Sequence, residues 1–134
     1  MSNSITSFTE LNVWISARKL SNDIYSISRE FPRQEQFGLT NQMRRCVVSV
    51  SSNIAEGCGR NYPKDSIQFF FIARGSIYEL ESQLYLAYDL GYIKEKRLNE
   101  LLTYIETSRK LLNGFIKYYQ TLAGPQYAPR TGKF

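Results

Sequence analysis

The chain has no histidine and only two cysteines among its 134 residues. Without His, Ser–His and Cys–His nucleophile pairs are excluded, as is the Glu-x-x-His pairing of di-iron helix bundles. Cys46 and Cys58 would lie roughly 15 Å or more apart along one helix, too far for a disulfide within the chain. Two separated thiols without His also provide no zinc site. Glu79 and Glu81, two residues apart on a helix, point to nearly opposite sides. We therefore expect no metal, no cofactor and no enzymatic activity.

Long hydrophobic runs are also missing. No window approaches the roughly 20 apolar residues that a membrane span requires, and residues 1–9 carry no basic, apolar signal segment. We expect a soluble, cytoplasmic protein with no membrane partner. A length of 134 residues indicates one domain with a single core.

Strand-like alternation is absent as well, whereas apolar residues recur at steps of three and four in four segments. Phe31-Pro32, Gly91 and Gly124-Pro125 mark helix ends, and Gly57 and Gly59 are predicted to form a left-handed cap. The pattern predicts an all-α, antiparallel up-down-up-down four-helix bundle. It spans residues 1–122, with helices at about 12–30, 39–57, 63–90 and 94–122, followed by a basic, mobile tail at 123–134.

The third predicted helix has an unusually wide apolar surface. Beside its core stripe, Phe71, Tyr78, Tyr85 and Tyr92 recur every seven residues on one flank. A four-helix monomer has no need of so much apolar surface on one helix, so we interpret the excess as a subunit interface. Base stacking is the alternative for this row, although packing against another helix is far commoner.

The second predicted helix carries a polar row beside its apolar stripe. The row contains small hydroxyls, an amide and charges, which are typical of positions where another helix or chain approaches. We predict that a set of residues on the second and third helices holds helices or subunits in register: Arg45, Ser49, Ser52, Asn53, Glu56, Phe71, Arg74, Tyr78, Glu79, Tyr85 and Tyr92.

The net charge of +5 comes entirely from the last part of the chain. Residues 109–134 contain five basic residues and no acidic one, whereas residues 1–108 are balanced. Favourable helix-dipole contacts explain part of this excess, and a surface for a polyanion explains the rest. The candidate nucleic-acid contacts are Arg44, Arg60, Lys64, Arg109, Lys110, Lys117, Arg130 and Lys133. Several of these arginines have ion pairs as an equally good alternative.

Several blocks in order resemble one known family, the 23S rRNA intervening-sequence proteins, over about residues 8–122. They begin with Leu11-Asn12-Val13-Trp14 and Phe31-Pro32, and continue with 38–40, 42–45, 52–57, 59–60, 72–76, 79–81 and 83–84. Ser51, where the family commonly has Pro or another small residue, and Tyr62-Pro63 depart from the pattern. The resemblance implies a four-helix bundle in a ring-like homo-oligomer, typically a pentamer, without a known activity. A distant resemblance in fold to the accessory protein of diversity-generating retroelements adds reverse transcriptase and nucleic acid as expected partners.

Together these observations favour a non-catalytic homo-oligomer that binds structured RNA or other nucleic acid through repeated basic surfaces. The alternative is a scaffold for a protein partner, such as a reverse transcriptase or a ribosome-associated factor. A glycine loop at residues 57–59 before Arg60 superficially resembles a phosphate cradle, but no strand precedes it and the Walker spacing is missing.

Overall fold

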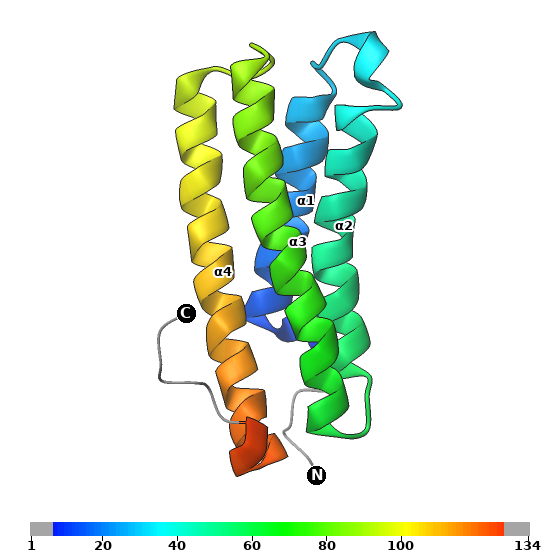
Figure 1. Cartoon of the computed structure of the whole chain (residues 1–134), viewed down its shortest axis with the longest axis vertical. Helices are drawn as coiled ribbons and strands as arrows, with labels where there is room; N and C mark the ends of the chain where they lie inside the picture. The colour runs from blue at the N-terminus through cyan, green and yellow to red at the C-terminus, as the bar shows by residue number, and fades with distance from the viewer. Residues whose placement is uncertain (1–6, 128–134) are drawn as a thin grey trace.

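A computed structural model describes residues 7–127 of the chain, and within this range it is all-helical. The four long helices lie side by side, and the connections between them alternate between the two ends of the bundle (Figure 1). Each helix packs against the next along the chain, and the first also packs against the fourth. The elements in order are η1 (Phe8–Glu10), α1 (Asn12–Ser28), η2 (Arg33–Glu35), α2 (Leu39–Cys58), α3 (Pro63–Asp89), α4 (Glu95–Ala123) and η3 (Pro125–Tyr127).

The four helices lie within two residues of their predicted bounds. The first ends at Ser28 rather than near residue 30, and two 3₁₀ turns, η1 and η2, lie in segments for which no structure was predicted. A third, η3, lies in the predicted tail. Pro63 takes the first position of α3, where its missing N–H group has no helical partner to lose.

Gly57 and Gly59 differ from the prediction in their role. Neither has a positive φ, and Gly59 is right-handed helical at φ −85°. Gly57 is instead buried inside the α2–α3 contact, where an added Cβ would lie only 2.4 Å from Cε1 of Phe70. The glycine is therefore needed for the close approach of Phe70, not for a left-handed cap.

Gly91 and Gly124 confirm the predicted ends of the last two helices. Gly91 has φ +81°, and the Tyr92 N–H donates to the Ala87 carbonyl at 2.9 Å, which is the Schellman arrangement. Gly124 has φ +118° directly after α4. Both positions use the left-handed backbone that glycine tolerates best.

The core lies along the axis between the four helices. Its largest fully buried side chains include Leu20, Met43, Phe70, Leu84 and Leu112, with contributions from every long helix. A few polar groups also join helices in the interior.

Two of these polar contacts tie α1 to α4. The hydroxyls of Ser16 and Ser108 lie 2.5 Å apart, and the Tyr104 hydroxyl donates to the Ser16 carbonyl at 3.1 Å. Buried polar groups that are satisfied in this way fix how the helices align.

Candidate interaction surfaces

The outer side of α3 exposes a group of large apolar side chains, here called the aromatic face. Exposed fractions range from 36% for Phe71 to 54% for Tyr78. Gly75 lies among them, and a Cβ added there would meet nothing within 4 Å. The aromatic face consists of Phe71, Ile72, Tyr78, Tyr85 and Leu86.

Tyr92 does not belong to this face. It lies beyond the end of α3, packs partly buried against the core, and its ring centroid is 5.2 Å from that of Phe31. Its hydroxyl donates to Glu35 at 2.7 Å, and this hydrogen bond raises the pKa of Tyr92. The seven-residue spacing suggested an interface residue, but the chain turns at Gly91 and points Tyr92 inward.

Part of the predicted polar row joins α2 to α3 within one chain. The Ser76 hydroxyl donates to the Ser49 hydroxyl at 3.0 Å, and the Cys46 thiol donates to the Ser76 carbonyl at 3.0 Å. The Asn53 amide donates to the Ser49 carbonyl at 2.8 Å. Burial raises the pKa of Cys46 to about 12, so the thiol stays protonated as this donor requires.

Arg45 and Glu79 lie together in a shallow groove between α2 and α3. Phe37, Asn41, Gln42 and residues of the Ser49–Ser76 contact complete its lining. Both charged side chains are exposed, and within residues 7–127 neither forms an ion pair.

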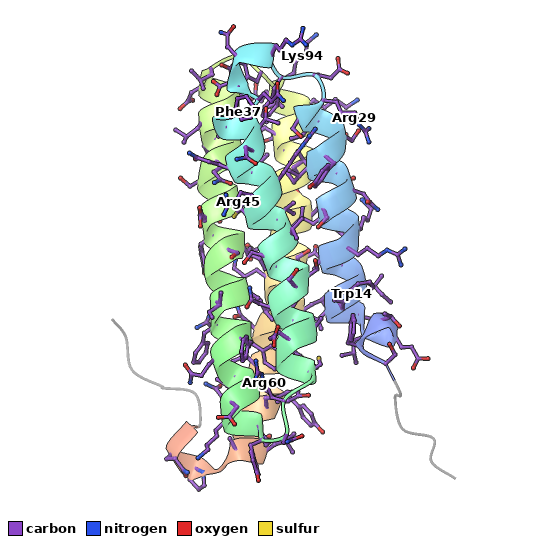
Figure 2. The ribbon with its side chains drawn as sticks, turned by 90° about the vertical axis from the view of Figure 1, so that its right-hand side faces the viewer. Trp14, Arg29, Phe37, Arg45, Arg60 and Lys94 are labelled. Carbon is purple, nitrogen blue, oxygen red and sulfur yellow. The ribbon has the colours of Figure 1, made fainter. Side chains whose placement is uncertain are left out.

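Figure 2 shows Arg45 on α2, Arg60 just beyond the far end of that helix, and Phe37 in the α1–α2 connection. Arg60 pairs with Glu56 at 2.7 Å and stacks on Phe69, with its guanidinium carbon 4.4 Å from the ring centroid. Ser52 is exposed one turn before Glu56. Arg60 therefore already has partners, unlike Arg45.

Arg109 is engaged within the chain, which differs from its predicted role as a nucleic-acid contact. Its side chain is only 12% exposed, pairs with Glu81 at 2.8 Å and with Glu106, and stacks on Tyr78. Burial opposes the charge, but the hydrogen bonds to both carboxylates outweigh it and raise the pKa of Arg109. The residue ties α3 to α4.

Two further arginines also contact neighbouring helices. Arg74 donates to Asn113 of α4 at 3.1 Å and stacks on Phe71. Arg44 donates to the Ser28 hydroxyl at 2.8 Å and stacks on Tyr25 of α1, with 4.6 Å between guanidinium carbon and ring centroid. Arg44 keeps part of its surface open, beside a hollow that Arg45 also lines.

The lysines of α4 form an open basic surface. Three lysines predicted as nucleic-acid contacts are exposed and form no ion pair within residues 7–127: Lys110 and Lys117 on α4, and Lys64 at the start of α3. Lys96 joins the same side of α4, and its spacing of 14 residues from Lys110 was the signal that could have identified it. Arg130 and Lys133 lie outside the described residues.

Phe37 is a feature that the sequence reasoning missed. Its side chain is 86% exposed at the end of the bundle. The connection that carries it is fixed by Glu35, which accepts hydrogen bonds from the Leu39 N–H at 3.0 Å and from Tyr92. These bonds, the backbone one first, lower the pKa of Glu35. The connection therefore holds the Phe37 side chain in water at a defined place.

An apolar hollow lies at the end of α2, between η1 and α4. Burial raises the pKa of Cys58 in its wall, and both cysteines are free thiols. The lining of this hollow is Ser7, Phe8, Leu11, Ala55, Cys58, Gly59, Phe115, Tyr118 and Tyr119.

Across residues 7–127, no helix is long and apolar enough to cross a membrane, and no three His, Cys, Asp or Glu side chains gather where they could hold a metal ion.

A family model, described as 23S rRNA-intervening sequence protein, matches residues 9–114. The chain belongs to this family. The match confirms the resemblance drawn from the sequence blocks, and it includes all of α1, α2 and α3.

The fold of this family member also matches a crystal structure determined at 1.70 Å. That protein, of unknown function, comes from the S23 ribosomal protein family of Bacteroides thetaiotaomicron VPI-5482. The similarity has a TM-score of 0.72 at 24% identity, and covers 78% of this chain and 98% of the other. It shows a shared fold. No curated protein matches the chain significantly.

Proposed function

We propose that this family member is a non-catalytic, cytoplasmic homo-oligomer that binds structured RNA or other nucleic acid. In this proposal the chain is an up-down-up-down bundle, and copies assemble into a ring, which the family resemblance makes a pentamer. Each copy then contributes one basic surface, so the surface is repeated around the ring.

The observation that carries the assembly is the aromatic face of α3. Five large apolar side chains, each at least 36% exposed, lie on one helix of a chain whose core is already filled. Covering them with a second copy removes apolar surface from water, at about 25 cal/mol per Å².

Binding to nucleic acid is supported by the open lysines Lys64, Lys96, Lys110 and Lys117. Three of the four lie on the outer side of α4, and the acidic residues Glu100 and Glu106 on the same helix are already paired with arginines. Each copy is a weak site, but several copies on one particle bind a single RNA with added avidity.

The test combines the particle mass with binding of a labelled RNA hairpin. We expect a multimer whose affinity for the hairpin falls steeply between about 50 and 200 mM salt, because binding releases counterions from phosphates. Absence of binding at the lower salt concentration, or binding that salt does not weaken, would contradict the nucleic-acid proposal.

A protein scaffold is the second candidate, and exposed Phe37 is the observation that favours it. The partner would be a reverse transcriptase or a ribosome-associated protein. Purification from the native host with and without nuclease separates the two: a protein retained after nuclease treatment favours the scaffold, and co-purifying nucleic acid favours the first proposal.

A further inference from the structure

The exposed sides of α2 and α3 differ in the size of their side chains. On α3, Phe71, Tyr78 and Tyr85 form a row of large rings about 21 Å long at 1.5 Å per residue. Gly75 and Ser82 lie between the rings on the same exposed side and leave gaps in the row.

The outer side of α2 is hollowed where small residues lie between charged ones. One hollow at the end of the helix has Ser52, Ala55 and Gly59 in its lining, with Glu56 and Arg60 beside them. A separate hollow lies nearer the start of the helix, and its lining is Tyr25, Asn41, Arg44, Arg45, Val48 and Ser49. The chain therefore carries both a ridge of rings and a concave strip.

The two rows also lie at the same height along the bundle. Gly57 of α2 meets Phe70 of α3 at one level, and Ser49 bonds Ser76 at another. If two copies stand side by side with parallel bundle axes and no vertical shift, the α3 rings from Phe71 to Tyr78 of one copy lie at the level of α2 residues 57 to 48 of the other.

The charges agree with this placement. Arg45 belongs to the strip on α2, and Glu79 lies beside the ridge on α3 at the same height, since both line one groove. Within residues 7–127 neither side chain forms an ion pair, so both charges are available to a second copy.

We infer that the α3 ridge of one copy packs into the α2 strip of the next copy, and that Arg45 of one copy faces Glu79 of the other. Such a contact joins two different surfaces, so it repeats around a ring instead of stopping at a dimer. The inference rests on the proposed assembly and specifies its interface.

Two variants test this contact, because each blocks one of its two surfaces and leaves the other intact. Tyr85→Asp places a charge on the ridge, and Ser52→Arg fills the strip with a long side chain; both positions are exposed, so the fold should tolerate the changes. We expect each variant alone to have the mass of one chain by light scattering. An equimolar mixture should double that mass, because the intact ridge of one variant fits the intact strip of the other.

Other results separate the inference from the proposal beneath it. If Ser52→Arg alone still assembles, or if the mixture stays monomeric, the ridge-to-strip contact is wrong although wild-type multimers would keep the proposed assembly. A monomeric wild-type chain would instead overturn the assembly itself. Circular dichroism melting of both variants checks that they remain folded.

Charge exchange tests the pairing of Arg45 with Glu79. Arg45→Glu and Glu79→Arg should each lower the fraction of multimer at least tenfold at low salt, because each places like charges across the contact. The double variant should restore it. If the double variant does not recover the multimer, the pairing is wrong. Lys19→Glu reverses a charge on α1, away from the contact, and serves as the control that should leave the fraction of multimer unchanged.

Discussion

Helices α3 and α4 are neighbours of similar length, yet their outer sides differ in chemistry. The outer side of α3 carries the aromatic face, whereas α4 exposes Lys96, Lys110 and Lys117 on one side among threonines, besides Leu111, Tyr118 and Leu122. Both helices contribute equally regular apolar residues to the core. The contrast therefore does not arise from folding of the monomer.

The two helices also differ in how well their exposed side chains suit contact with water. The hydroxyls of Thr103 and Thr107 of α4 donate hydrogen bonds to carbonyls of their own helix, so these exposed polar groups need no further partner. Tyr85 and Leu86 of α3 are about half exposed, at 48% and 50%. This difference is the basis for proposing that copies assemble through the α3 side and that the α4 side binds a polyanion.

Breaking the aromatic face should have the largest effect. Tyr85→Asp should reduce the particle to a single chain, because the carboxylate would have to be buried without a partner in the interface. Thr103→Asp on α4 is the matched control and should leave the mass unchanged. Multi-angle light scattering measures both, and equal behaviour of the two variants would contradict the comparison.

Removing the α4 lysines should have the next largest effect. We expect RNA hairpin binding to weaken by more than about tenfold in the triple variant Lys96→Gln, Lys110→Gln and Lys117→Gln. The slope of log affinity against log salt concentration should become shallower by about 2 to 3 per bound subunit, because each lost lysine removes one phosphate contact. Lys19→Gln, which removes a lysine paired with Asp23, serves as control. Fluorescence anisotropy at several salt concentrations measures the effect, and an unchanged salt slope would count against the α4 surface.

Glycine positions sharpen the comparison between buried and exposed helix sides. Gly57→Ala should lower the free energy of unfolding by about 1–3 kcal/mol, because the new methyl group collides with Phe70. Gly114→Ala, in open space on α4, should raise it by roughly 0.5–1 kcal/mol. Urea unfolding measures both, and a neutral Gly57→Ala would refute the close approach.

Alkaline pH should also reduce stability, through the buried thiol of Cys46. The folded state raises the pKa of this thiol from 9.0 to about 12, mainly by burial. Folded protein thus favours the protonated thiol, and its contribution to stability is complete below pH 9 and lost as pH rises toward 12. Cys46→Ala should lose less stability than wild type between about pH 7 and pH 11 in urea unfolding. An identical loss in both proteins would contradict this.

Helix number and helix ends could be predicted because they depend on local signals. The apolar spacing, Gly91 and Gly124-Pro125 act within one or two turns of chain. The partners of Arg109 and Ser49 could not be predicted, because Glu81 is 28 residues and Ser76 is 27 residues away in sequence. Periodicity shows which side of a helix faces inward, but not how neighbouring helices align. The same limit explains why Gly57 was predicted as a cap and Tyr92 as part of the aromatic face.

The mass of the wild-type particle tests the central claim most directly. Light scattering of the purified full chain should give a multiple of the single-chain mass, five-fold for the proposed ring, at micromolar concentration. A particle with the mass of one chain would mean that the aromatic face of α3 remains open to water, and would contradict the account.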